Sequence, residues 1–273
     1  QTVALTGGAS ATHGAVTASV TDDGGGTFTV ELVAAPGLTP SSANLLLESL
    51  SYAHAGENPT PGARTITLTA LVDSGPGTGT PGDPAGDDNF GETTPFSIVT
   101  VEAVNDAPVI GGLDGDGATL PASGGTVALD TGGDATIADV DTLAFDGGRI
   151  AVTRSGSLEG DFSLDTGAGV AAGADAGSAD GVIEAGETVF VAGTAVGTVA
   201  EAGQGAADLV IDLLPAAERS DAGGSGSAAD ILRAVRYTPA ESGSHAFSVT
   251  VRDLAAAADG ATSDAAIVSV DVE

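Results

Sequence analysis

The stretch AESGSHAFSVTVRD, residues 240–253, decides the fold class of this chain. In it Phe247, Val249 and Val251 alternate with smaller or polar residues. Successive side chains of a β-strand point to opposite faces of its sheet, so this alternation predicts a strand with one buried face. Further strands are expected around Val30, Ile66, Val101 and Val270, and at 125–129, 149–153, 188–192 and 208–213.

Several of these segments occur twice in the chain. The pairs are LLLESLSY (ending at Tyr52) with DILRAVRY (ending at Tyr237), TFTVELV (around Val30) with DLVIDLL (around Ile211), TITLTALVD (ending at Asp73) with FSVTVRD (ending at Asp253), and SIVTVEAV (around Val101) with AIVSVDVE (around Val270). Their order is the same in both halves, which indicates an internal repeat.

The repeat predicts two domains. Residues 107–273 are expected to form a complete repeat, and residues 1–106 the C-terminal part of another. The first copy starts level with about Thr188 of the second, so roughly 80 residues of it are expected to precede Gln1.

One short helix is expected in each repeat. SSANLLLESL offers Ser41 or Ser42 as N-cap, and GSAADILRAV offers Ser227. Many short strands separated by Gly-rich turns, with no long helical segments, predict an all-β chain of tandem antiparallel β-sandwiches.

The charge balance excludes several kinds of partner. Asp and Glu number 38 against 7 Lys and Arg, which gives a net charge of −31. Such a chain repels phosphate, so we expect neither nucleic acid nor membrane insertion, and no apolar run approaches the ~20 residues of a membrane span. The acid content has three readings: solvation, adaptation to high salt, or binding of divalent cations.

Acidic residues cluster at the boundary between the repeats. VEAVNDAPVI, residues 101–110, contains Glu102, Asn105 and Asp106, and the D-x-D pair Asp139 and Asp141 follows further on. A strand, a turn and a returning strand would bring the pair back to the same end of a sandwich. Carboxylate and amide oxygens are the ligands that Ca²⁺ prefers, although an ordinary Asn-Asp turn also explains the boundary.

VNDAP at 104–108 followed by DVD at 139–141 resembles the cadherin-like repeats of large bacterial RTX-type surface adhesins. The stretches LDTGGDATIADVDTLAFDGGRIAV, NPTPGARTITLTALVD and ADILRAVRYTP are similar to that family too. The resemblance implies Greek-key sandwiches of the cadherin or immunoglobulin type, with calcium shared between neighbouring repeats. It makes Asn105, Asp106, Asp139 and Asp141 the implied ligands, with Glu57 a weaker candidate. Ala107 departs from the pattern, since cadherins usually have a further polar ligand there.

A second candidate calcium loop is AGSADGVIEAGE, residues 176–187. Read as an EF-hand loop, it has Asp180 at position 5 and Glu187 at position 12. Ala176 stands where the first ligand should be, and no flanking helices are evident. A plain acidic hairpin loop is the competing interpretation.

Nothing in the sequence favours catalysis. GTGTPG at 77–82 satisfies G-x-G-x-x-G but lies in a Pro-rich loop and opens no helix. His13, His54 and His245 are scattered and are expected in surface loops. Trp is absent and Tyr numbers 2, whereas glycosidase clefts usually have aromatic platforms. We therefore expect no enzyme.

The interpretation favoured here is a calcium-rigidified spacer in a secreted or surface-anchored bacterial adhesin, whose first partners are neighbouring repeats of the same chain. Self-assembly of identical chains into an extracellular filament, sheath or surface layer is the alternative. A second alternative is a module that binds glycans or host proteins through the loops at 74–95 and 165–187.

Overall fold

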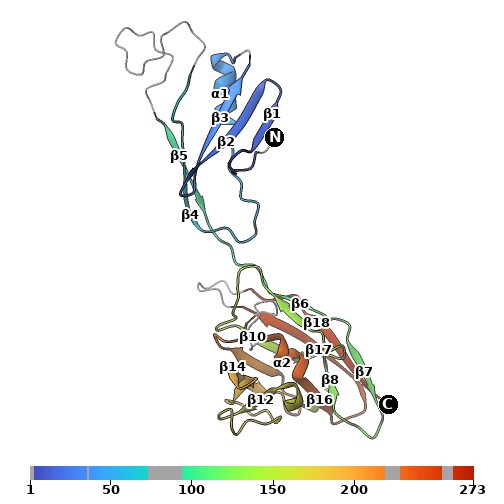
Figure 1. Ribbon diagram of the computed structural model, residues 1–273. Coiled ribbons are helices and arrows are strands. Elements are labelled where there is room, and N and C mark those ends of the chain that lie inside the picture. Colours follow the sequence, from blue (N-terminus) through green and yellow to red (C-terminus); the bar gives the residue numbers. More distant parts are fainter. Residues whose placement is uncertain (1–2, 36, 73–93, 219–227, 254–260) are drawn as a thin grey trace, which may run out of the picture. The chain divides into compact units, whose positions relative to one another are not determined.

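The computed structural model describes residues 3–35, 37–72, 94–218, 228–253 and 261–273. The chain divides into two compact units, Gln1–Glu102 (unit 1) and Ala103–Glu273 (unit 2). The described residues are mostly β-strand in several sheets, with two α-helices, in agreement with the expected all-β class (Figure 1).

Unit 1 contains five strands and one helix among its described residues: β1 (Ser10–His13), β2 (Val16–Gly24), β3 (Thr27–Ala34), α1 (Pro40–Glu48), β4 (Gly62–Thr67) and β5 (Phe96–Val101). β1, β2 and β3 form one antiparallel sheet, and β4 pairs with β5 in a separate antiparallel hairpin.

Helix α1 begins earlier than the sequence predicts. The N-cap is Thr39, whose hydroxyl accepts a hydrogen bond from the N–H of Ser42, and not Ser41 or Ser42. Pro40 at the first helical position explains the difference, because its fixed φ favours the first turn and it has no N–H to satisfy. The other expected cap, Ser227, lies outside the described residues, as do most of the loop at 74–95 and all of 77–82.

The elements of unit 2 are β6 (Val109–Gly111), β7 (Gly117–Leu120), β8 (Val127–Ala128), β9 (Thr136–Ala138), β10 (Arg149–Arg154), β11 (Gly160–Leu164), the 3₁₀ turn η1 (Thr166–Ala168), β12 (Val170–Gly173), β13 (Thr188–Val191), β14 (Thr194–Ala202), β15 (Leu209–Leu213), α2 (Ala228–Ala234), β16 (Val235–Pro239), β17 (Gly243–Arg252) and β18 (Ala266–Val272). Eight strands form one sheet in the order β12-β13-β14-β15-β10-β17-β18-β7, and three form a second in the order β11-β16-β8. β6 pairs with β9.

The two larger sheets of unit 2 pack on each other to give a sandwich-like arrangement. Ile150 and Val249 from the eight-stranded sheet belong to the same buried cluster as Phe162 and Tyr237 from the three-stranded sheet. The predicted alternation of β17 is confirmed, since Phe247, Val249 and Val251 are at most 1% exposed. This core holds β9 and β17, the strands from which the acidic site is built.

Candidate metal centre

The end of β17 places a carboxylate inside unit 2. Asp253 follows β17 directly and is 0% exposed. Its Oδ2 accepts a hydrogen bond from the side-chain amide of Asn105 at 2.9 Å, and its Oδ1 accepts one from the N–H of Ala261 at 2.7 Å. Asn105 and Asp253 are therefore in direct contact although 148 residues separate them.

A second buried carboxylate follows β9. Asp139 is 4% exposed, and its Oδ1 accepts hydrogen bonds from the N–H groups of Asp141 at 2.8 Å and Thr142 at 2.7 Å. Asp141 in turn accepts a hydrogen bond on Oδ2 from the N–H of Asp106, at 2.6 Å. The D-x-D pair and the Asn105–Asp106 segment therefore meet at one place, as their spacing predicts.

The charges of this cluster act on one another. Burial raises the pKa of the Asp139 carboxyl above its ordinary value; the N–H groups of Thr142 and Asp141 oppose the rise, and the negative charges of Asp253 and Asp141 add to it. The fold thus buries the carboxylates of Asp139 and Asp253 within electrostatic reach of each other, next to the half-buried Asp141.

Asp253 is the member of the acidic cluster that the sequence did not single out. It ends the segment FSVTVRD, which marked the repeat. The signal available was an acidic residue at the end of a strongly alternating strand, and such a residue lies at the rim of a core where its carboxylate can be buried.

Two other predicted ligands, Glu102 and Glu57, belong to unit 1. Glu102 is the last residue of unit 1 and is exposed, and Glu57 is exposed in the loop between α1 and β4.

The loop at 176–187 lies between strands β12 and β13, without the flanking helices of an EF-hand. Asp180 is paired with Ala172 in a β-bridge, and its carboxylate accepts the N–H of Val182 at 2.8 Å. The carboxylate of Glu187 accepts the N–H of Glu184 at 2.9 Å. Both side chains thus hold turns of their own loop, which is what the hairpin interpretation expects.

The donor types around Asp139 suit a hard cation. Within the described parts of the chain, no three His, Cys, Asp or Glu side chains already form a metal-binding group. Calcium, however, also takes amide and main-chain oxygens, and a carboxylate oxygen that accepts one N–H keeps a second lone pair. Asp141, Asp253 and Asn105 therefore bring further oxygens of the kind that calcium takes to the same cluster as Asp139.

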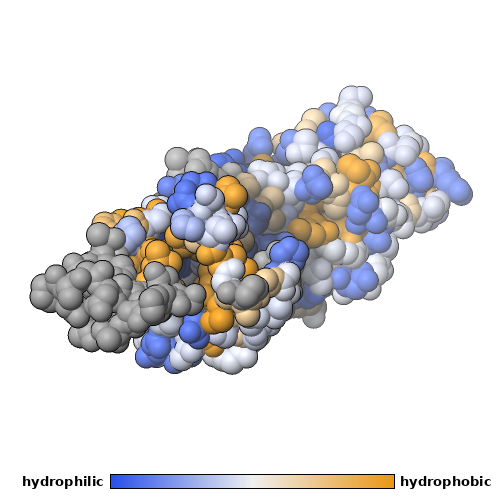
Figure 2. Space-filling view, turned by 90° about the horizontal axis from the view of Figure 1, so that it is seen from above, coloured by the Kyte–Doolittle hydropathy of each residue, from blue (hydrophilic) through white to orange (hydrophobic). Residues whose placement is uncertain are grey.

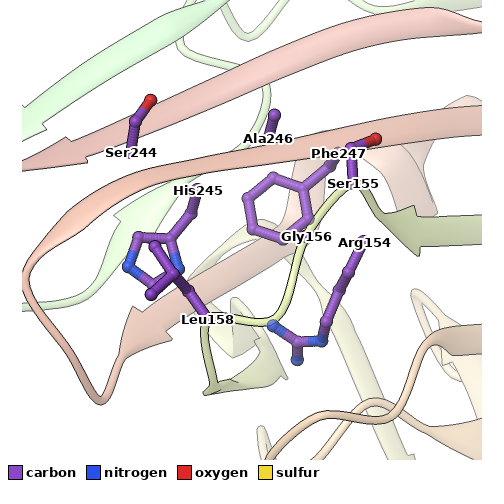
Figure 3. A pocket seen from close by; sticks show the side chains of 8 residues that line it. All are labelled: Arg154, Ser155, Gly156, Leu158, Ser244, His245, Ala246 and Phe247. Atoms are coloured by element: carbon purple, nitrogen blue, oxygen red, sulfur yellow. The ribbon is translucent and has the colours of Figure 1, made fainter.

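A small pocket elsewhere in unit 2 is lined by the last residue of β10, by residues just after it and by residues in the first half of β17 (Figure 3). Arg154 and His245 are its charged or titratable members. His245 is 3% exposed within β17, which corrects its expected place in a surface loop. One ring nitrogen contacts the hydroxyl of Tyr237 at 2.8 Å and the other the carbonyl of Glu241 at 3.0 Å, so the ring is part of the core.

Comparisons with protein-family models, with curated proteins and with solved structures find no match for this chain. Among the helices in the described ranges, none has the length and apolar character needed to cross a bilayer.

Proposed function

We propose that this chain is a calcium-binding structural segment of a secreted or surface-attached bacterial protein, in which bound calcium stiffens tandem β-sandwich repeats. The observation that carries the proposal is the pair of buried carboxylates, Asp139 and Asp253, together with the Asn105–Asp106 segment, which is hydrogen-bonded to Asp253 and to Asp141.

Electrostatics supports a cation at this place. Ionised carboxylates lose hydration on burial, and like charges in a region of low dielectric repel strongly. Burial and the charges of Asp253 and Asp141 already raise the pKa of Asp139. A bound divalent cation would supply positive charge that offsets the repulsion between these carboxylates.

The residues that would hold the ion are Asp139, Asp141, Asp253 and Asn105, with Asp106 beside them. Calcium takes about 6–8 oxygen ligands in flexible geometry, which suits a mixture of side-chain and main-chain oxygens. Asn105 and Asp106 lie on the segment that enters unit 2, so an ion held with them would restrain that segment.

The finer fold that we propose is a Greek-key sandwich of the cadherin type, repeated along the chain. Its support is the strand order β15-β10-β17, in which neighbours in space are not neighbours in sequence, together with the repeated segments of the chain. A row of such repeats with restrained connections would act as a spacer that holds a distal binding region away from the cell.

Small-angle X-ray scattering of the chain, with calcium and after chelation by EDTA at the same ionic strength, tests the spacer function. We expect EDTA to broaden the distribution of intramolecular distances and to speed proteolysis near residues 103–108. Identical scattering curves and proteolysis rates in the two conditions would contradict it. Ordered fibres or lattices with calcium would instead favour the assembly alternative.

A further inference from the structure

Two polar side chains meet inside the core of unit 2, and neither belongs to the acidic cluster. Figure 2 shows hydrophilic residues, in blue, over the face of the molecule that it draws. By contrast, His245 of β17 is 3% exposed and Tyr237 of β16 is 0% exposed. The Tyr237 hydroxyl lies 2.8 Å from Nδ1 of His245. Because buried polar groups need hydrogen-bond partners, the contacts of this pair restrict where its protons lie.

The contacts of His245 fix which ring nitrogen carries a proton. Nε2 lies 3.0 Å from the carbonyl oxygen of Glu241, which can only accept a hydrogen bond, so Nε2 carries a hydrogen. In the neutral ring Nδ1 is then bare, and it accepts the O–H of Tyr237. In the charged ring Nδ1 also carries a hydrogen, and it must donate that hydrogen to the Tyr237 oxygen instead.

The Tyr237 hydroxyl has a second acceptor. Its oxygen lies 3.0 Å from the carbonyl oxygen of Glu159, to which it can donate when Nδ1 of His245 is protonated. This carbonyl also accepts the N–H of Ala240 at 3.0 Å, so it keeps a hydrogen bond when the hydroxyl points to His245. Burial raises the pKa of the Tyr237 hydroxyl, although Arg154 opposes the rise. The hydroxyl therefore keeps a proton to donate in either direction.

The charged groups around the pair oppose one another. The Arg154 guanidinium of β10 donates to the Tyr237 oxygen at 3.1 Å, and its positive charge disfavours a second cation on His245. The charges of Asp161 and Glu241 reach Tyr237 and act in the opposite direction. Four exposed acidic residues lie on the segments around the pair: Glu159, Asp161 of β11, Glu241 and Asp271 of β18.

We propose that His245 and Tyr237 form a buried proton switch, in which His245 takes up a proton while unit 2 stays folded and the Tyr237 hydroxyl turns from His245 to the carbonyl oxygen of Glu159. Rotation of one O–H bond accommodates the change, and each polar group of the pair keeps a partner in both states. A buried neutral histidine without such a rotor destabilises its fold when it becomes charged. The core of unit 2 is therefore built to tolerate mild acidification, and this property does not depend on calcium.

Long-range ¹H–¹⁵N correlation spectra of the histidine rings test the switch, recorded on the chain between about pH 8 and pH 5. At the alkaline end we expect Nε2 of His245 to be protonated and Nδ1 to be bare. On acidification Nδ1 should gain a proton while the dispersed methyl signals of the core, such as those of Val249, keep their positions. His13, which is exposed on β1, is the internal standard. The variants His13→Asn and His54→Asn assign the signals.

The variant Tyr237→Phe tests the part played by the hydroxyl. It takes the acceptor from a charged N–H in one state and the donor from a neutral nitrogen in the other, and the first loss is the larger. His245 should therefore titrate at least about half a pH unit lower than in the wild type. The chain has two tyrosines, and Tyr52→Phe is the matched control that should leave this midpoint unchanged.

Three results would overturn the proposal. The first is a bare Nε2 on His245 at the alkaline end of the titration, which the wild-type spectra report even if Tyr237→Phe does not fold. The second is a His245 ring that stays neutral until unit 2 unfolds. The third is the same titration midpoint for His245 in the wild type and in Tyr237→Phe.

Discussion

At the scale of single residues, the acidic side chains of this protein have two structural uses. Many hold turns: Asp130 is 2% exposed and accepts the N–H groups of Gly133 at 2.6 Å and Ala135 at 2.9 Å. Asp139 does the same within its own turn, but the charges of Asp141 and Asp253 also act on it. A bound cation would offset the repulsion that Asp141 and Asp253 exert on Asp139.

We expect the variant Asp139→Asn to be at least as stable as the wild type without calcium and less stable than the wild type with calcium. Because burial raises the folded-state pKa of Asp139, the folded state holds the proton more tightly than the unfolded state. Without calcium, the contribution of Asp139 to the free energy of unfolding is then most favourable below the ordinary value of 3.8 and is lost as pH rises through the folded-state pKa. Asn stays neutral, so at pH 7 in EDTA the variant should melt no lower than the wild type.

With saturating calcium the wild type should be more stable than the variant. The wild type gains the free energy of calcium binding, whereas the variant lacks one ligand. At 100 times the dissociation constant this gain is about 2.7 kcal/mol. Thermal unfolding followed by circular dichroism measures both conditions, with the exposed Asp146→Asn as the charge-matched control. A variant that is less stable than the wild type by the same amount in both conditions would show a purely structural role.

Part of this site could be predicted from sequence. The spacing from Asp106 to Asp141 fits a strand down and back, and the structure brings the two residues into contact. Asp253 was missed because its partner Asn105 is 148 residues away, and no local pattern reports such a contact. The EF-hand spacing of Asp180 and Glu187 carried no information on the turns of their own loop, whose N–H groups both carboxylates accept.

At the scale of elements, Arg154 at the end of β10 connects several strands of the sandwich. Its guanidinium donates to the carbonyl oxygens of Ala207 at 2.8 Å, Gly160 at 2.7 Å and Gly203 at 3.0 Å. It also lies 4.6 Å from the centre of the Phe162 ring. A planar group with five donors can make these contacts at once, and a lysine cannot.

Arg154→Lys should therefore destabilise unit 2 by about 2–3 kcal/mol, because buried carbonyl groups lose charged donors. Arg149→Lys is the matched control: Arg149 forms an exposed ion pair with Asp212, worth about 1 kcal/mol or less. Urea unfolding gives both values. Equal losses in the two variants would show that the contacts of Arg154 add nothing to the stability of the sandwich.

Strands were predictable where alternation was strong. β10, β15, β17 and β18 lie where the pattern of Val and Ile predicts them. Short strands such as β7 (GATL) and β12 (VAAG) were missed, because small residues give no alternation and tertiary pairing decides their conformation. The sequence predicted the helix in each unit, but the cap of α1 is Thr39, followed by Pro40 at the first helical position.

At the scale of the whole molecule, the net charge of −31 opposes compaction everywhere, not only at the acidic cluster. Salt screens this repulsion over a Debye length of about 8 Å at physiological ionic strength. A general effect of divalent cations on such a chain must therefore be separated from binding at one place. Measurements at constant ionic strength, with magnesium in place of calcium, make that separation.

The most direct test of the calcium site is isothermal titration calorimetry of the chain with calcium at constant ionic strength. We expect saturable binding, with a dissociation constant on the order of 10⁻⁴ M or tighter, as in extracellular modules. Asp253→Asn should weaken it at least about tenfold, whereas Asp146→Asn should leave it unchanged. No saturable heat in the wild type, or equal affinity in all three proteins, would contradict calcium binding between Asp139 and Asp253.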